Sequence, residues 1–297
     1  MKRILLFSVV ILLASSALRA QDRKESLERD GIYTRETTPA RVPIPYQFVR
    51  EADVIWSKRV WRVIDLRQKM NYPLYYPTKL MQDRESLVQR LVRAIKYNEI
   101  NAYKDEEFTE RLSYQQVIEE RLGAKDKVED SLDLEGNIVY GQDGIPLKKI
   151  IPGEINWRDI KELLVKEDWF FDKQRSVMEV RIIGICPILH RTDYRKTGSD
   201  EEQEGTLSRI PTFWIYFPEA RSVLANTDAY NNFNDAQRIT YDDLFWKRNF
   251  DSYIIRISNV WDNRAIDEYT FTGLQTLLES EKIKTELFNF EHDLWEY

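Results

Sequence analysis

Residues 46–77 read YQFVREADVIWSKRVWRVIDLRQKMNYPLYYP, and the fold depends on the secondary structure that this stretch adopts. Acidic residues precede its apolar run and basic residues follow it, as the dipole of a helix favours. The residues near helical spacing are Trp56, Val60, Val63, Ile64 and Met70. This pattern predicts a helix over residues 51–70. Residues 60–66 are also short, β-branched and partly alternating, so a strand is the alternative.

The end of the stretch, residues 71–77, contains three tyrosines and two prolines. Proline fixes φ and removes a backbone donor, so the sequence predicts a stiff, extended segment. Tyrosine combines a large contact area with a polar tip, which suits an interface. The candidate partner-binding residues are therefore Trp56, Trp61, Tyr72, Tyr75 and Tyr76. The alternative is that the tyrosines close the core of their own domain.

The rest of the chain predicts an α+β fold with a helical N-terminal part, a glycine-rich hairpin region, and a small antiparallel or mixed sheet packed with helices. Helices are predicted at residues 83–100, capped by Asp83, at 113–122, where Ser113 and Gln116 form a capping box, and at 156–171, 240–245 and 270–290. Strands are predicted at residues 177–189, 212–217 and 253–260. Residues 123–153 hold half of the ten glycines and predict hairpin turns around a strand at 138–140, and residues 191–205 predict a solvated, mobile loop.

The N-terminus predicts export. Residues 1–20 combine Lys2 and Arg3 with a short apolar run and small residues, as a signal peptide does, with cleavage after Ala20 or Ala17. Residues 21–50 predict a polar, proline-rich arm that lies along either a neighbouring subunit or its own domain. Residues 51–297 predict one α+β domain, with a sub-boundary near 123–153. The aromatic tail after residue 290 could dock on this domain or reach a partner.

Charge and cysteine content narrow the class of protein. The net charge is −6, and removing residues 1–20 leaves 41 basic and 50 acidic residues, or −9, which argues against a nucleic-acid binder. The only cysteine, Cys186, lies in an apolar run and predicts a buried thiol without a disulfide. No cysteine lies near the predicted cleavage site, so attachment to a membrane would need a partner.

No catalytic motif is visible, so the sequence predicts no catalytic, cofactor-binding or metal-binding residue. The two histidines are His190 and His292, and His190 ends an apolar strand, as a structural or surface histidine would. A calcium loop around Gly136 fails because Gln142 occupies the position of the closing Glu. Asp168 and Asp172, beside three aromatic residues, are weak candidates for a sugar-cleaving carboxylate pair.

The chain also carries a resemblance to a known family. The segments that carry it are residues 53–67 and 71–77, with support from 30–33, 39–45, 108–114, 155–171 and 212–218. In these segments the chain resembles the GldN/PorN family, the gliding-motility and type IX secretion proteins of the Bacteroidota. These segments are family signatures and carry no catalytic motif.

The resemblance implies a non-enzymatic, periplasmic structural subunit at the inner face of the outer membrane. It implies self-association in a ring with a GldK/PorK-like lipoprotein, and it makes the periplasmic part of a GldM/PorM-like motor protein a further candidate partner. The alternatives are a periplasmic carboxylate-dependent glycan hydrolase and a monomeric periplasmic binding module. The size of the native particle would distinguish these three hypotheses.

Overall fold

Three long antiparallel strands form the centre of the fold: β1 (Val54–Asp65), β6 (Ile160–Asp172) and β7 (Val177–Asp193). They belong to an eight-stranded sheet in the order β12-β1-β6-β7-β9-β2-β3, with β8 paired to β7. The other members of this sheet are β2 (Ala102–Tyr103), β3 (Arg111–Leu112), β8 (Thr206–Pro211), β9 (Trp214–Tyr216) and β12 (Tyr253–Ile257). Helices pack against this mostly antiparallel sheet, which confirms the α+β class.

The computed structural model describes residues 40–81, 84–125, 127–130, 148–151, 153–193, 206–234 and 236–294. One compact unit spans Arg41–Tyr297. The predicted signal peptide, residues 21–39, the strand at 138–140 and most of the predicted loop at 191–205 lie outside the described residues. Two short strand pairs lie outside the main sheet: β4 (Lys127–Asp130) with β5 (Lys148–Ile151), and β10 (Asp228–Ala229) with β11 (Ile239–Thr240).

Two predicted helices are strands in the structure. Residues 51–70 form a short 3₁₀ turn, η1 (Glu51–Asp53), and then β1, so the helix prediction is wrong and the strand alternative is correct. Residues 156–171 likewise form the turn η4 (Trp157–Asp159) and most of β6. The physical reason is burial on both faces of the sheet. Residues 60–64 are all buried, so polar and apolar residues alternate only in part along the strand, and its apolar positions imitate helical spacing.

The remaining helices follow their predicted capping signals more closely. The helix α3 (Leu87–Lys96) has Ser86 as its N-cap, where the sequence predicted Asp83, and Ser86 forms a capping box with Gln89. Ser113 and Gln116 form the predicted box of α4 (Tyr114–Gln116), which continues into the π-helical turn η3 (Val117–Arg121). Thr240 caps α6 (Tyr241–Trp246) with Asp243. The helix α5 (Phe217–Ala225) was not predicted from the sequence.

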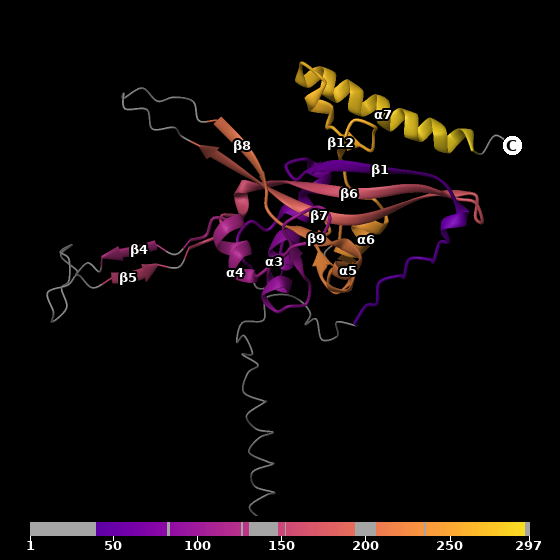
Figure 1. Cartoon of the computed structure of the whole chain (residues 1–297). Helices are drawn as coiled ribbons and strands as arrows, with labels where there is room; N and C mark the ends of the chain where they lie inside the picture. Colours follow the sequence, from indigo (N-terminus) through magenta and orange to yellow (C-terminus); the bar gives the residue numbers. More distant parts are fainter. Residues whose placement is uncertain are drawn as a thin grey trace, which may run out of the picture. The chain divides into compact units, whose positions relative to one another are not determined.

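The long helix α7 (Gly273–Asp293) covers the β12 edge of the sheet, as Figure 1 shows. It buries Ile283 and Leu287 against Val60 and Ile254. The buried Ser280 hydroxyl accepts a hydrogen bond from the N–H of Ile254 at 2.9 Å. The helix therefore satisfies a backbone donor at an edge that would otherwise be free to pair with another chain.

The helices α5 and α6 gather near β7 and β9, away from α7 (Figure 1). They help to form the largest apolar core, together with α3 and with the part of β1 around Ile64. The opposite face of the central strands packs Trp61, Cys186 and Trp214 together. Cys186 is buried, as predicted, and burial raises the pKa of its thiol to about 12.

Candidate partner-binding surface

After β1 the chain turns sharply through η2 (Lys69–Asn71) and α2 (Tyr72–Tyr75). The prediction of an extended segment at residues 71–77 is therefore wrong for its first part. Pro73 lies in the first turn of α2, where a missing N–H removes no helical hydrogen bond. Only from Tyr76 onward is the backbone extended.

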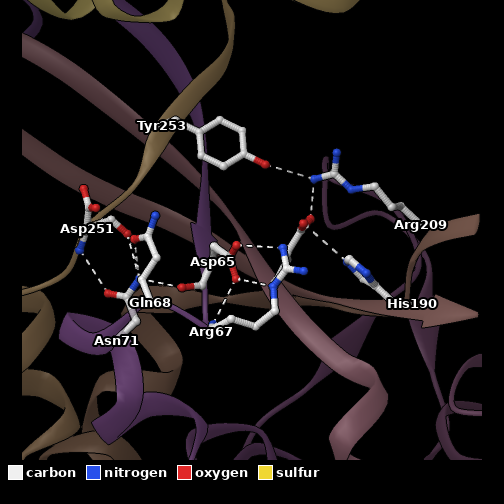
Figure 2. Close-up of polar contacts among 9 residues, drawn as sticks. Asp65, Arg67, Gln68, Asn71, His190, Arg209, Asp251 and Tyr253 are labelled. Carbon is white, nitrogen blue, oxygen red and sulfur yellow. Dashed lines mark hydrogen bonds and ion pairs between the residues drawn. The ribbon is translucent and has the colours of Figure 1, made fainter. Parts of the chain in front are cut away.

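Asn71 holds this turn to the rest of the domain, as Figure 2 shows. The side chain is fully buried, and its Nδ2 atom donates to the carbonyl of Asp65 at 2.7 Å and to that of Asp251 at 2.9 Å. Its Oδ1 atom accepts from the N–H of Asp251 at 2.9 Å. One amide thus joins the end of β1 to the loop before β12 and fixes where α2 begins.

Three tyrosines, Tyr72, Tyr75 and Tyr76, form a continuous cluster that we call the tyrosine patch. The Tyr76 ring meets those of Tyr72 and Tyr75 edge-on, with centroids 5.5 and 4.8 Å apart. The hydroxyl of Tyr75 donates to the carbonyl of Arg158 at 3.1 Å, and Leu74 is buried beneath the patch. Tyr72 and Tyr76 remain 38% and 49% exposed, so their rings are held in place yet accessible.

The two tryptophans of the predicted surface lie elsewhere. Trp56 is partly buried and stacks on Phe290 of α7, with centroids 4.7 Å apart. Trp61 is buried against Cys186 and donates its indole N–H to Glu106 at 3.0 Å. The structure therefore brings together three of the five candidate residues. A role of these five residues in binding a partner stays a prediction.

A partly buried polar network lies beside the end of β1, where Glu162 is paired with Asp65 in the sheet. Glu162, at the start of β6, forms an ion pair with Arg209 of β8, and its Oε1 atom lies 3.4 Å from Nε2 of His190. Arg209 also donates to the hydroxyl of Tyr253 at 3.2 Å (Figure 2). Burial and the charge of Glu162 raise the pKa of Tyr253, although Arg209 opposes the change. These contacts join β6, β7, β8 and β12 at one corner.

Asp65 closes β1 beside this network. Burial acts to raise the pKa of its carboxyl group, but hydrogen bonds from Arg67 outweigh burial and lower that pKa below its usual value. The Arg67 guanidinium donates to both carboxylate oxygens, at 2.9 and 2.7 Å. Sequence reasoning missed this cluster because its residues come from distant strands, and only the histidine carried a visible signal.

The predicted carboxylate pair is not brought together. Asp168 accepts two hydrogen bonds from Arg59, at 2.6 and 2.9 Å, and Asp172 accepts one from Arg175 at 2.8 Å, which lowers the pKa of Asp172. Both acids lie on β6, four residues apart, so their backbones are separated by about 13 Å. Paired glycosidase carboxylates are about 5–9.5 Å apart, so this pair does not suit that chemistry.

Comparison with known protein families shows to which family this chain belongs. The profile of a family described as "Gliding motility associated protein GldN" matches residues 49–296. The chain belongs to the GldN family. The match begins just before β1 and runs to the end of α7, so the GldN region includes the tyrosine patch and the polar network. A search of curated proteins found no significant match.

The described part of this GldN-family chain contains neither a candidate membrane-spanning helix nor a candidate metal-binding cluster. No helix there is long and apolar enough to cross a membrane. No group of three or more His, Cys, Asp or Glu side chains there is arranged to hold a metal ion.

Proposed function

We propose that the chain is a non-enzymatic structural subunit of the type IX secretion and gliding machinery. In this proposal it self-associates in a periplasmic ring with a GldK/PorK-like lipoprotein at the inner face of the outer membrane. The periplasmic part of a GldM/PorM-like motor protein is a further partner. The observation that carries the proposal is the match of residues 49–296 to a gliding-motility family.

The geometry of the tyrosine patch supports a role in assembly. Asn71, Leu74 and the Tyr75 hydroxyl bond hold the patch, so little conformational entropy would be lost when a partner covers it. Large, fixed aromatic side chains with polar tips are common at the energetic centres of interfaces. The exposed side chains of Met70 and Leu80 flank the patch in sequence and could extend the contact.

Fractionation tests the location and the tether. The predicted signal peptide and the lack of a cysteine at its cleavage site motivate a periplasmic protein that is held at the outer membrane by a lipoprotein. Cells lacking the lipoprotein should release this chain into the soluble periplasmic fraction, whereas cells containing it should retain the chain with the outer membrane. Retention without the lipoprotein would contradict the tether.

Particle size tests the assembly. In Tyr72→Ala and Tyr76→Ala variants, each truncation should cost about 2 kcal/mol or more per contact, which is roughly thirtyfold in affinity. Complexes isolated from the envelope should therefore be smaller or absent, while the monomer keeps its melting temperature within a few degrees. Tyr97→Ala is the matched control because Tyr97 is exposed but lies outside the patch. A native-sized ring in a variant that carries both Tyr72→Ala and Tyr76→Ala would refute the patch as an assembly contact.

A further inference from the structure

Between the sheet and α7, two arginines share one buried carboxylate. Glu167 is fully buried in β6, and its carboxylate lies 3.2 Å from Nε of Arg62 and 3.0 Å from Nη1 of Arg248. It also accepts from the indole N–H of Trp169 at 3.0 Å. Within the described ranges, no other carboxylate lies at ion-pair distance from either arginine. The two arginines and Glu167 together therefore carry a charge of +1, and the more distant Glu281 also acts on Arg62.

Arg62 uses few of its five N–H donors. The residue is 6% exposed, and its one hydrogen bond runs from Nη1 to the Ser252 hydroxyl at 3.4 Å. Its Nε atom faces Glu167 without hydrogen-bond geometry. Burial lowers the pKa of Arg62, and the charge on Glu167 opposes this only in part. A buried guanidinium with open donors favours an anionic partner.

These donors face a cavity of about 400 Å³, within the range of small-ligand sites. Its apolar lining includes the rings of Trp169, Phe250 and Phe288. Arg62 and Arg248 both stack on Trp169, with their Cζ atoms 5.4 and 5.5 Å from its ring centroid. The cavity thus combines a cationic group with aromatic walls.

The remaining charges of the cavity restrict the ligand. Glu281, Lys284 and Glu291 of α7 line it as well, together with Asp251, and Lys284 lies 3.4 Å from Glu281. These acids would repel a multiply charged anion, so the anion that fits has a single carboxylate, which the open donors of Arg62 can bind. A guanidinium can also bind a carboxylate through two parallel hydrogen bonds.

We propose that this cavity binds a carboxylate carried on an apolar or aromatic body, with Arg62 as the group that recognises the charge. Two sources share that chemistry: a free organic acid, and the carboxyl terminus of a peptide that ends in an apolar residue. The proposal does not rest on the assembly function, because no residue of the tyrosine patch lines the cavity.

The first test is a calorimetric titration of the full mature chain with phenylacetate. Binding should saturate, and the neutral amide phenylacetamide should bind at least about tenfold more weakly because it lacks the charge. The Arg62→Met variant should lose a similar factor. It keeps the Glu167–Arg248 ion pair and the Trp169 bond, so the remaining charges balance. Arg59→Met is the matched control, since this arginine of the same strand pairs with Asp168 outside the cavity.

A second variant separates binding from folding. Thr285 lines the cavity from the exposed side of α7, so Thr285→Trp should fill the space and abolish binding without removing either arginine. Unsaturable phenylacetate binding to the native chain would overturn the proposal. Native affinity in either folded variant, Arg62→Met or Thr285→Trp, would also overturn it.

Short peptides distinguish the two sources. A tripeptide ending in phenylalanine with a free carboxyl group should bind more tightly than phenylacetate if the site recognises chain ends. Its carboxamide form should then bind at least about tenfold more weakly. If the site takes free organic acids, phenylacetate should bind more tightly than either peptide. Equal binding of the carboxylate and carboxamide peptides, together with equal binding of phenylacetate and phenylacetamide, would refute recognition of the charge.

Discussion

Two short segments that each contain two prolines and at least one tyrosine are attached to the domain in different ways. The arm at residues 41–50 has no regular secondary structure and lies against its own domain. The segment at residues 71–77 forms a helical turn whose asparagine and leucine are buried. Two prolines therefore accompany an extended arm on the surface in one segment and a turn built into the core in the other. What differs is the source of the hydrogen bonds that each backbone receives.

The arm is held mainly by side chains of the body. Arg221 of α5 donates to the carbonyl of Ile44 at 2.6 Å and stacks on the Tyr46 ring, with its Cζ atom 4.5 Å from the centroid. Arg181 donates to the carbonyl of Gln47 at 2.6 Å. Burial raises the pKa of the Tyr46 hydroxyl, which agrees with a ring enclosed by the body. Removing one such side chain should free the arm without dismantling the sheet.

Of the variants considered, Arg221→Met should lower the free energy of unfolding most. This change removes the anchor of the arm and leaves Asp242, which accepts from Arg221 at 2.9 and 3.1 Å, buried and unpaired. Breaking a buried ion pair in this way costs about 3–5 kcal/mol. Urea denaturation should show that loss, and limited trypsin digestion should cut within the arm. A loss below about 1 kcal/mol with a protected arm would show that Arg221 does not anchor it.

Asn71→Ala should have the next largest effect, on the segment that is built into the core. The substitution leaves the N–H of Asp251 and two carbonyl groups without the Asn71 side chain, and such a buried loss costs about 1–3 kcal/mol. The free energy of unfolding, measured in urea, should fall by that amount. Asn156→Ala is the control, since Asn156 is exposed and bonds to nearby Asp159. Equal stability of the two variants would contradict the clamp.

The sequence predicted local features well and long-range features poorly. The capping boxes at Ser113 and Thr240 were readable because each depends on residues three positions apart. The strand β1 was misread because tertiary packing on both faces of the sheet buries residues 60–64, which the local sequence does not reveal.

In the candidate partner-binding surface, too, the local features could be predicted from the sequence and the long-range contacts could not. The tyrosine patch was visible because its three rings are neighbours in the sequence. The Glu162 network and the Asn71 clamp were invisible, because each includes a partner far along the chain: Arg209 is 47 positions from Glu162, and Asp251 is 180 positions from Asn71. Trp61 was assigned to the surface because residue type alone does not reveal which face of a strand is covered.

Acid should loosen both segments by a smaller amount. Asp65 beside the patch and Asp243 beside the arm both have a lowered pKa, because hydrogen bonds outweigh the opposing effect of burial. A folded-state pKa below the unfolded value contributes stability above the unfolded pKa, near 4, and this stability is lost as the pH falls through the folded value. The free energy of unfolding should therefore decline below about pH 4.

The variants Asp65→Asn and Asp243→Asn identify the segment responsible for this decline. Each should flatten part of the acid limb of a plot of stability against pH. An acid limb that is unchanged in both variants would assign the decline to other carboxyl groups.

The smallest effect on folding should come from Phe48→Ser in the arm. Phe48 is 90% exposed, so the substitution should change the free energy of unfolding by no more than about 0.5 kcal/mol. If the patch carries the assembly contact, Phe48→Ser should also leave the size of the native complex unchanged, whereas Tyr76→Ser should reduce it. Light scattering of the purified complex measures this difference. The opposite result would be a normal complex with Tyr76→Ser and a smaller one with Phe48→Ser. It would assign the assembly contact to the arm at residues 41–50 in place of residues 71–77. The exposed Phe48 ring could make such a contact, because the bound backbone of the arm holds it in solvent where a neighbouring subunit can reach it.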